Sequence, residues 1–298
     1  MAPWAPGQNG AFIKGLFPLT LPRHHLTWQT LGAVPSTLLI PLAARAKGAS
    51  VFPQLDPHDV CANDVLAALH TNVQTYLNDW VTVLNVLWRT QAIKRMGQSF
   101  FQRHPHSQGV NLGAGLSSYF QWFDNGHNRW LDADLPEVMS LRRLIFQVLP
   151  PHCRHQTLNI TRPGWWQRLQ LPKGQRAQPV LLICEGVLMY LTPAQVHAVL
   201  QEISDNAPSG SEFIFDFMSP VGIGHACLHP SVKDTGAEFT WGVRHVSQFV
   251  AQFSRLEVHE QRSVSEAYGM ACCLTELLTA PFTGGPLYGL LRLAAANR

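Results

Sequence analysis

A glycine-rich turn and a pair of carboxylates are the first residues whose types and spacing could do chemistry. Gly113-Ala114-Gly115 follows a short apolar run, and Asp132 and Asp134 end the next one, about 20 residues further on. Glycines let a backbone pass close to a ligand and adopt positive φ. In a parallel sheet, a carboxylate at the end of the next strand reaches ribose hydroxyls. Together the two features predict a ligand that contains a nucleoside.

Each feature alone has a simpler interpretation. Ser118 stands where a dinucleotide fingerprint has its third glycine, and no P-loop Lys-Ser/Thr follows. The glycine triplet therefore also fits a tight turn without a ligand, and the carboxylates also fit a solvated helix start. His24-His25 and the His104/His106 pair lack further ligands at fixed spacing, so we predict surface histidines and no metal site.

The elements that must position these residues alternate between strand and helix. The apolar run at 180–184 is typical of a buried parallel strand. Thr192 and Pro193 are a good N-cap and first helical residue for a helix that reaches about Asn206. Further strands are expected at 110–112, 129–134 and 212–217, and a helix at 135–148. This order predicts an α/β fold, with a parallel sheet wrapped by helices.

The flanking segments have weaker patterns. Helical periodicity at 57–77 and 78–97 predicts a helical and loop cap over residues 1–100, preceded by an irregular arm or lid at 1–35 that includes Phe12, Phe17 and Trp28. The core then spans 101–298, with an acceptor-site insertion around 219–245, a helix at 246–253 and a strand at 256–264. Beyond Tyr268 no element is assigned, and Pro281, Gly284, Gly285 and Pro286 break any terminal helix.

Composition excludes several classes of protein. The 298 residues are 46% hydrophobic and 14% charged, which excludes a disordered chain. The net charge of +3 comes without any run of five basic residues, so no nucleic-acid or membrane partner is expected. The six cysteines show no CxxC spacing, and neither a signal peptide nor a run of about 20 apolar residues is present. We therefore expect a soluble cytoplasmic protein with reduced thiols.

Short motifs in the right order resemble one family. It is the leucine carboxyl methyltransferase-like branch of class I S-adenosylmethionine-dependent methyltransferases, which includes tetracenomycin-type polyketide methyltransferases. The resemblance covers about residues 36–260 and implies a Rossmann-like class I methyltransferase sheet. The matching motifs are Pro41-Leu42-Ala43-Ala44-Arg45-Ala46, Asp56-Pro57, Arg89-Thr90, Val110-Asn111-Leu112-Gly113-Ala114-Gly115-Leu116, Arg129-Trp130-Leu131-Asp132-Ala133-Asp134-Leu135-Pro136-Glu137-Val138 and Glu185-Gly186-Val187-Leu188-Met189-Tyr190-Leu191.

The resemblance also implies roles in binding S-adenosylmethionine and its product S-adenosylhomocysteine. Arg89 would hold the methionine carboxylate, with Gly113, Ala114 and Gly115 lining the turn beside it. Asp134 would bind the ribose, and Glu185 the amino group. Asn159 and Ile160 would lie at the adenine.

The sequence departs from the family at two positions. Asn159 begins Asn159-Ile160-Thr161-Arg162 where the family has Asp-Leu-Arg-Asp, and Ser117-Ser118 replaces Asp-Thr. An amide at 159 can still accept a hydrogen bond from the adenine amino group.

These observations predict an O-methyltransferase that acts on a carboxylate or phenolic oxygen of a small molecule, such as a polyketide. No general base stands out. His225 and His229 are candidates by residue type alone, and the lack of a clear base slightly favours a carboxylate acceptor, which is already ionised. The catalytic residues stay unassigned. The alternatives are a methyltransferase for a protein C-terminal carboxylate and a catalytically silent protein that binds S-adenosylmethionine. We expect a monomer or weak homodimer.

Overall fold

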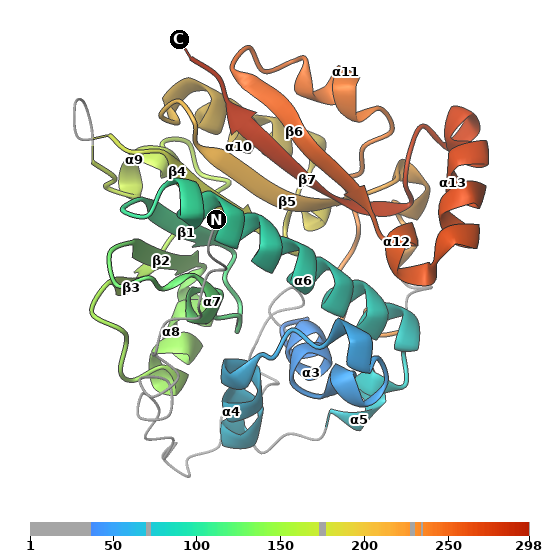
Figure 1. The fold of residues 1–298 in the computed structure, drawn as a ribbon, viewed down its shortest axis with the longest axis horizontal. Helices are drawn as coiled ribbons and strands as arrows, with labels where there is room; N and C mark the ends of the chain where they lie inside the picture. The colour runs from blue at the N-terminus through green and yellow to red at the C-terminus, as the bar shows by residue number, and fades with distance from the viewer. Residues whose placement is uncertain (1–36, 70–72, 173–176, 227–229, 234, 298) are drawn as a thin grey trace.

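The computed structural model describes residues 37–69, 73–172, 177–226, 230–233 and 235–297. Its centre is a seven-stranded sheet with the order β3-β2-β1-β4-β5-β7-β6 (Figure 1). The strands are β1 (Gln108–Leu112), β2 (Arg129–Asp134), β3 (Cys153–Thr157), β4 (Val180–Cys184), β5 (Glu212–Met218), β6 (Leu256–Ser263) and β7 (Tyr288–Ala295). The predicted α/β fold is confirmed.

The chain reverses direction across the sheet at β1. From β1 it proceeds outward through β2 and β3, then returns to place β4 on the other side of β1, and all of these neighbours are parallel. Ligands of open α/β sheets bind at the carboxyl ends of the strands at such a switch point. Gly113, Asp134 and Glu185 follow or end β1, β2 and β4, so the topology brings them to one edge.

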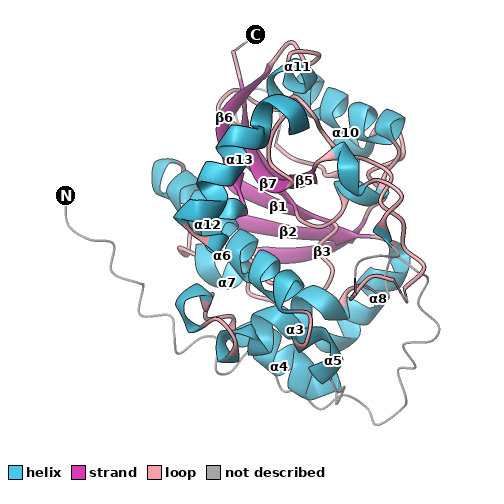
Figure 2. Cartoon of the chain, turned by 90° about the vertical axis from the view of Figure 1, so that its right-hand side faces the viewer, coloured by secondary structure: helices cyan, strands magenta, loops and turns pink. Residues whose placement is uncertain are grey.

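Helices cover both faces of the sheet (Figure 2). On one face, α6 (Trp80–Arg103) packs Trp88, Ile93 and Phe100 against Ile183 and other strand residues. On the other face lie α9 (Trp165–Arg168), α10 (Pro193–Asn206) and α11 (Val246–Val250). The expected cap at Thr192 is present as a capping box with Gln195. Two further helices flank the parallel strands, α7 (Phe120–Phe123) and α8 (Pro136–Ile145).

Within the described residues, three short helices precede α6, and the first of them lies over the carboxyl edge of the sheet. They are α3 (Leu39–Lys47), α4 (Val60–Leu69) and α5 (Gln74–Leu77). The apolar residues of α3 pack on α4 and on α8. The predicted helix at 57–77 is thus two helices, and the predicted helix at 78–97 is longer and packs on the sheet. The boundary at residue 100 stays a prediction, and the arm at 1–35 lies outside the described residues.

Sequence analysis missed α3, β3 and the C-terminal elements. β3 carries the mixed sequence CRHQT, whose alternation is too weak to mark a strand. After the predicted strand β6 come α12 (Ser265–Tyr268), α13 (Met270–Thr283) and β7. The α13 helix includes Pro281 and ends before Gly284, which has φ +82°. β7 then enters the sheet antiparallel to both β5 and β6, so the sheet is mixed rather than all parallel.

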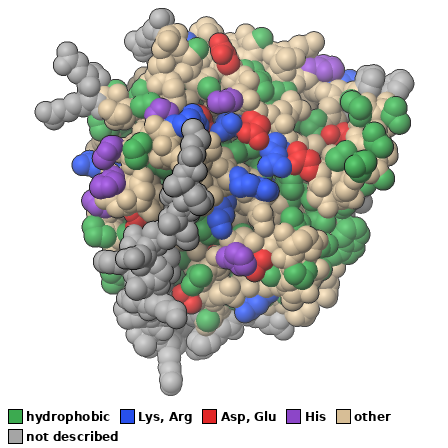
Figure 3. All heavy atoms as spheres, in the orientation of Figure 1, with side chains coloured by type: hydrophobic (Ala, Val, Ile, Leu, Met, Phe, Trp, Pro, Cys, Tyr) green, Lys and Arg blue, Asp and Glu red, His purple; other side chains and the backbone are tan. Residues whose placement is uncertain are grey.

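The surface shows one notable apolar region. Met270, Leu274, Leu277 and Leu278 of α13 are all more than half exposed. Figure 3 shows apolar side chains gathered on the right-hand side of the molecule, where Figure 1 places α13. Within the described ranges, no helix combines the length and the apolar character that crossing a bilayer requires.

Candidate functional site

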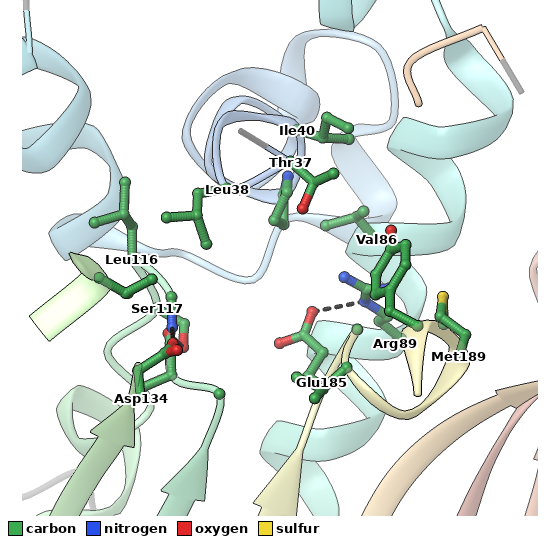
Figure 4. Close-up of a pocket in the computed structure, with 18 of the residues that line it drawn as sticks. Thr37, Leu38, Ile40, Val86, Arg89, Leu116, Ser117, Asp134, Glu185 and Met189 are labelled. Atoms are coloured by element: carbon green, nitrogen blue, oxygen red, sulfur yellow. Dashed lines mark hydrogen bonds and ion pairs between the residues drawn. The ribbon is translucent and has the colours of Figure 1, made fainter. Parts of the chain in front are cut away.

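A cavity of about 460 Å³ opens where the strands β1, β2 and β4 end. Figure 4 shows Asp134 and Glu185 at its floor, Arg89 of α6 at one side, and Leu38 and Ile40 near α3 above it. All eight residues predicted to bind the cofactor lie in its wall: Arg89, Gly113, Ala114, Gly115, Asp134, Asn159, Ile160 and Glu185. The role of each residue in binding the cofactor stays a prediction.

The glycine turn has the backbone geometry that only glycine adopts easily. Gly113 has φ +68° and Gly115 has φ +50°. A Cβ on Gly113 would lie 2.3 Å from Val187 Cγ2, which leaves no room for a side chain. The N–H groups of Gly113 and Ala114 both donate to the carbonyl of Ala133, at 2.8 and 3.2 Å. The turn is therefore tied to the end of β2.

A buried arginine supports this turn from behind. Arg142 of α8 donates through Nη1 to the carbonyls of Gly115 and Ser117, both at 2.8 Å. Its Nη2 forms an ion pair with Asp132, at 2.7 Å, and Asp132 also accepts from Trp130 Nε1 at 2.9 Å. Asp132, one of the two carboxylates singled out above, therefore faces the interior and does not line the cavity.

Asp134 faces the cavity, with both carboxylate oxygens bound to backbone. Oδ2 accepts from the N–H of Gly115 and Oδ1 from the N–H of Leu135, both at 2.7 Å. Burial raises the pKa of this carboxyl above its ordinary value despite these hydrogen bonds. Each oxygen can accept a further hydrogen bond, which is the capacity that a ribose diol requires.

Arg89 and Glu185 form the centre of a buried polar cluster. Arg89 Nε donates to Glu185 Oε1 at 2.6 Å, and Nη1 donates to Asp216 at 3.1 Å and to the hydroxyl of Tyr288 at 2.8 Å. Tyr288 in turn donates to Asp216 at 2.6 Å, and Tyr119 donates to Glu185 at 2.5 Å. Arg89 is thus a buried site residue rather than a surface arginine.

This geometry modifies the predicted function of Arg89. With Nε and Nη1 bound to protein groups, only Nη2 has no hydrogen-bond partner among the described residues. Nη2 lies 3.4 Å from the ideal Cβ position of Gly186, so a Cβ there would be in van der Waals contact with it. Arg89 can therefore offer one nitrogen, Nη2, to a ligand carboxylate.

The protonation states of the cluster follow from burial and charge. Burial alone would raise the pKa of Glu185, but Arg89 and Arg45 outweigh it and hold the pKa below its ordinary value. Burial raises the pKa of Asp216 above its ordinary value, although Arg89 opposes this. Burial also raises the pKa values of Tyr119 and Tyr288 well above 10, so both phenols stay protonated and act as donors.

Sequence analysis did not assign a function to Arg45, Tyr119, Asp216 or Tyr288. Arg45 is only 3% exposed, lines the cavity, and uses Nε in an ion pair with Asp59 at 3.0 Å. Arg45 is a charged residue within the apolar segment of α3, and this pattern could have identified it as a candidate site residue. Asp216, which has apolar neighbours on both sides in β5, gave a similar signal. Tyr288 had none, because its strand was not recognised.

Asn159 lies in the wall, but its side-chain oxygen is already engaged. Oδ1 accepts from the backbone N–H of Thr161 at 2.9 Å and from its hydroxyl at 2.7 Å. Two donors occupy the two lone pairs, so the amide N–H₂ is the group left for a ligand. The expectation that Asn159 accepts from the adenine amino group does not fit this arrangement.

The opposite end of the cavity is mainly apolar. Its wall comes from α6, the turn after β4, the end of β5, the segment 219–245 and the residue before β7. It includes Val86, Met189, Met218, Val232, Phe239 and Leu287. The segment 219–245 contributes Val232 and Phe239, and it is attached by the N–H of Thr240, which donates to the carbonyl of Met189 at 2.8 Å. No His, Lys or Cys is among the described residues that line the cavity.

The described residues also contain no cluster of three or more metal-ligating side chains. His104 and His106 lie at the end of α6, away from the cavity wall. His24, His25 and His229 fall outside the described residues.

Comparison with known proteins agrees with this architecture. The family model for leucine carboxyl methyltransferases matches residues 44–204, more than half of the chain. The tetracenomycin polyketide synthesis O-methyltransferase TcmP of Streptomyces glaucescens is 25% identical over 238 residues, covering 80% of this chain and 85% of that protein. The S-adenosyl-L-methionine-dependent methyltransferase dpfgK of Gibberella zeae is 26% identical over 259 residues, with the same two coverages.

A solved structure shares the fold at low sequence identity. The crystal structure of a methyltransferase from Thermobifida fusca superposes with a TM-score of 0.52 at 14% identity, and the match covers 87% of this chain and 94% of that one. The family match extends from α3 to α10 and so includes every predicted cofactor-binding residue. The chain belongs to the leucine carboxyl methyltransferase family of class I S-adenosylmethionine-dependent methyltransferases.

Proposed function

We propose that this methyltransferase transfers the methyl group of S-adenosylmethionine to an oxygen of a small, largely apolar molecule, either a carboxylate or a phenol. The observation that carries the proposal is the division of one cavity into two chemically different ends. The glycine turn, Asp134 and the Arg89–Glu185 pair form a polar end, and aliphatic and aromatic side chains form the other.

The polar end fits the parts of S-adenosylmethionine. Asp134 offers lone pairs to the ribose hydroxyls, and Glu185 is an ionised carboxylate suited to the amino group. The carboxylate of the ligand would meet Arg89 Nη2 and Arg45, since both arginines lie close enough to Glu185 to lower its pKa. When bound, S-adenosylmethionine supplies an electrophilic methyl group on a positively charged sulfur.

The apolar end suits a largely apolar acceptor, and the reaction proposed there uses no general base. Asp134 and Glu185 belong to the polar end, Asp216 is buried behind the wall, and no His or Lys lines the cavity among the described residues. A carboxylate, with a pKa of about 4, is already ionised at pH 7 and requires no base. The protein then has to orient the acceptor oxygen and exclude water, and orientation alone can greatly accelerate a displacement.

The composition of the wall also favours a small acceptor over the C-terminus of a protein. A peptide needs hydrogen-bond partners for its backbone, whereas the acceptor end is formed largely by Val86, Met189, Met218, Val232 and Phe239. TcmP, by its name, acts in polyketide synthesis, which supports a small acceptor for this chain too. We further propose a cytoplasmic monomer or weak homodimer.

The test is turnover with radiolabelled S-adenosylmethionine against two pools of acceptors. One pool contains small aromatic and aliphatic acids and phenols, and the other contains peptides with free C-termini. Label in an ester or ether of the first pool is the expected result. Methylation confined to the peptides would contradict the small-molecule assignment, and S-adenosylhomocysteine binding without turnover in either pool would favour the silent binding protein.

A further inference from the structure

One face of α6 links the two ends of the cavity. Thr82, Asn85, Val86 and Arg89 all line it, at the spacing that places residues on one side of a helix. Arg89 belongs to the polar cluster described above. Asn85 lies one turn nearer the helix N-terminus, about 6 Å along the axis, at the acceptor end.

Tyr268 determines which part of the Asn85 amide faces a ligand. The Tyr268 hydroxyl donates to Asn85 Oδ1 at 3.1 Å. The Tyr268 ring packs edge-on against Trp80, with centroids 6.3 Å apart, so the hydroxyl is held by packing from two elements. No described residue accepts from Asn85 Nδ2, which leaves this N–H₂ group as the donor available to a ligand.

The surroundings of Asn85 make its N–H₂ group selective for ligands with an accepting oxygen. Val86, Met218 and Leu287 of the same wall present no hydrogen-bonding side chain. The nearby carboxylate of Asp79 does not line the cavity, and it accepts from the hydroxyls of Thr82 and Ser231, both at 2.7 Å. Asn85 is half-buried, and a donor in an apolar wall favours a ligand that places an accepting oxygen there, because a donor shielded from water without a partner is costly.

We infer that Asn85, oriented by Tyr268, is a specificity-determining residue that binds an acceptor carboxylate through the oxygen that does not react. This inference rests on the proposed function. The second oxygen is then free to attack the methyl carbon: a C–O bond forms, the C–S bond breaks, and its electron pair stays on sulfur. The negative oxygen and the positive sulfonium both become neutral, and no proton has to move. A phenolate has one oxygen for both tasks and satisfies this site less well.

Binding of a matched pair of probes tests the inference. Naphthalene-2-carboxylate and naphthalene-2-carboxamide are titrated by calorimetry into the full chain saturated with S-adenosylhomocysteine. The wild type should bind the carboxylate at least about tenfold more tightly than the carboxamide, because hydrogen bonds to charged groups are the stronger kind. Equal binding of the two probes, or binding of neither, would overturn the inference.

Three variants assign this preference to Asn85. Asn85→Asp replaces the donor by a negative charge of the same shape, and it should weaken carboxylate binding at least about tenfold while changing carboxamide binding less than about threefold. Tyr268→Phe keeps the ring against Trp80. It should also reduce the preference for the carboxylate over the carboxamide, but by less than Asn85→Asp does. Gln98→Glu adds the same charge to α6 about 20 Å away and should leave both probes unchanged.

Binding of S-adenosylhomocysteine to each variant separates the two proposals. If the wild type fails to bind it, the proposed function itself is wrong. If S-adenosylhomocysteine binds normally to every variant but Asn85→Asp keeps the carboxylate preference, only the assignment of Asn85 is wrong.

Discussion

Arg89 and Glu185 lie 96 positions apart in the sequence, yet Arg89 Nε and Glu185 Oε1 are 2.6 Å apart in the fold. The pair joins a helix that crosses the sheet to the turn after the central strand β4. Because Asp216 and Tyr288 also bind the same guanidinium, four separate segments meet at this point.

Replacing Arg89 should affect the amino-acid end of the donor alone. We expect Arg89→Ala and Arg89→Lys to weaken S-adenosylmethionine and S-adenosylhomocysteine by about 2 kcal/mol, because Lys cannot bind Glu185, Asp216 and a ligand from one planar group. Calorimetry measures the loss. 5′-Methylthioadenosine lacks the amino-acid end and is the control, so its affinity should hardly change; equal weakening of all three ligands would mean that Arg89 only supports the fold.

The Asp134→Asn variant should show the opposite pattern with the same ligands. Its amide cannot accept from the N–H groups of both Gly115 and Leu135 and also serve a ribose diol. Every ligand that contains the ribose, 5′-methylthioadenosine included, should lose about tenfold or more in affinity. Normal binding of 5′-methylthioadenosine to this variant would remove Asp134 from the ribose site.

Two glycine substitutions distinguish the effect of backbone strain from the effect of a side chain that has no room. Gly113→Ala brings a Cβ within 2.3 Å of Val187, and it should abolish the thermal stabilisation by S-adenosylhomocysteine, worth about 2.7 kcal/mol at one hundred times the dissociation constant. Gly126→Ala is the matched control, since Gly126 also has positive φ, at +78°, but a Cβ there meets nothing within 4 Å. It should lose about 1 kcal/mol of folding stability and keep the full ligand effect. An unchanged ligand effect in Gly113→Ala would exclude the turn from the site.

The stability supplied by Glu185 should depend on pH in a defined direction. Its folded-state pKa lies below the ordinary 4.5, so its ionised form stabilises the fold above that pH, and this stabilisation is lost as the pH falls through the lowered pKa. Urea unfolding of the wild type and Glu185→Gln between pH 3 and 8 measures the difference. The wild type should be more stable by a constant amount above about pH 5, and its advantage should shrink below pH 4.5. An advantage that grows on acidification would contradict the lowered pKa.

Turnover should not require a divalent metal. An acceptor that is already anionic needs no Lewis acid to activate its oxygen. Among the described residues, the cavity wall includes only two carboxylates, Asp134 and Glu185, which both have protein partners. Activity measured after exhaustive treatment with a strong chelator should match that of untreated protein. Loss of turnover that magnesium or zinc restores would instead indicate a metal-assisted mechanism.

The sequence alone determined the parts of the fold and site that rest on local chemistry. An apolar run such as 180–184 can only be buried, and Thr192 with Pro193 marks a helix start through its own side chain and ring. Gly113 and Gly115 indicate a turn with positive φ, because other residues rarely adopt that backbone conformation. The order of the motifs was sufficient to predict the family, and the resemblance to that family gave eight of the residues that line the cavity.

Only the tertiary structure decided how those residues use their atoms. β7 was not predicted because its identity as a strand depends on pairing with β5 and β6, and pairing between distant segments leaves no periodic mark in the sequence. Tyr288 was therefore not predicted as a site residue, although with Asp216 it occupies Nη1 of Arg89. Residue types fix which hydrogen bonds are available, but the partner each group takes depends on which segments the fold brings within 3 Å.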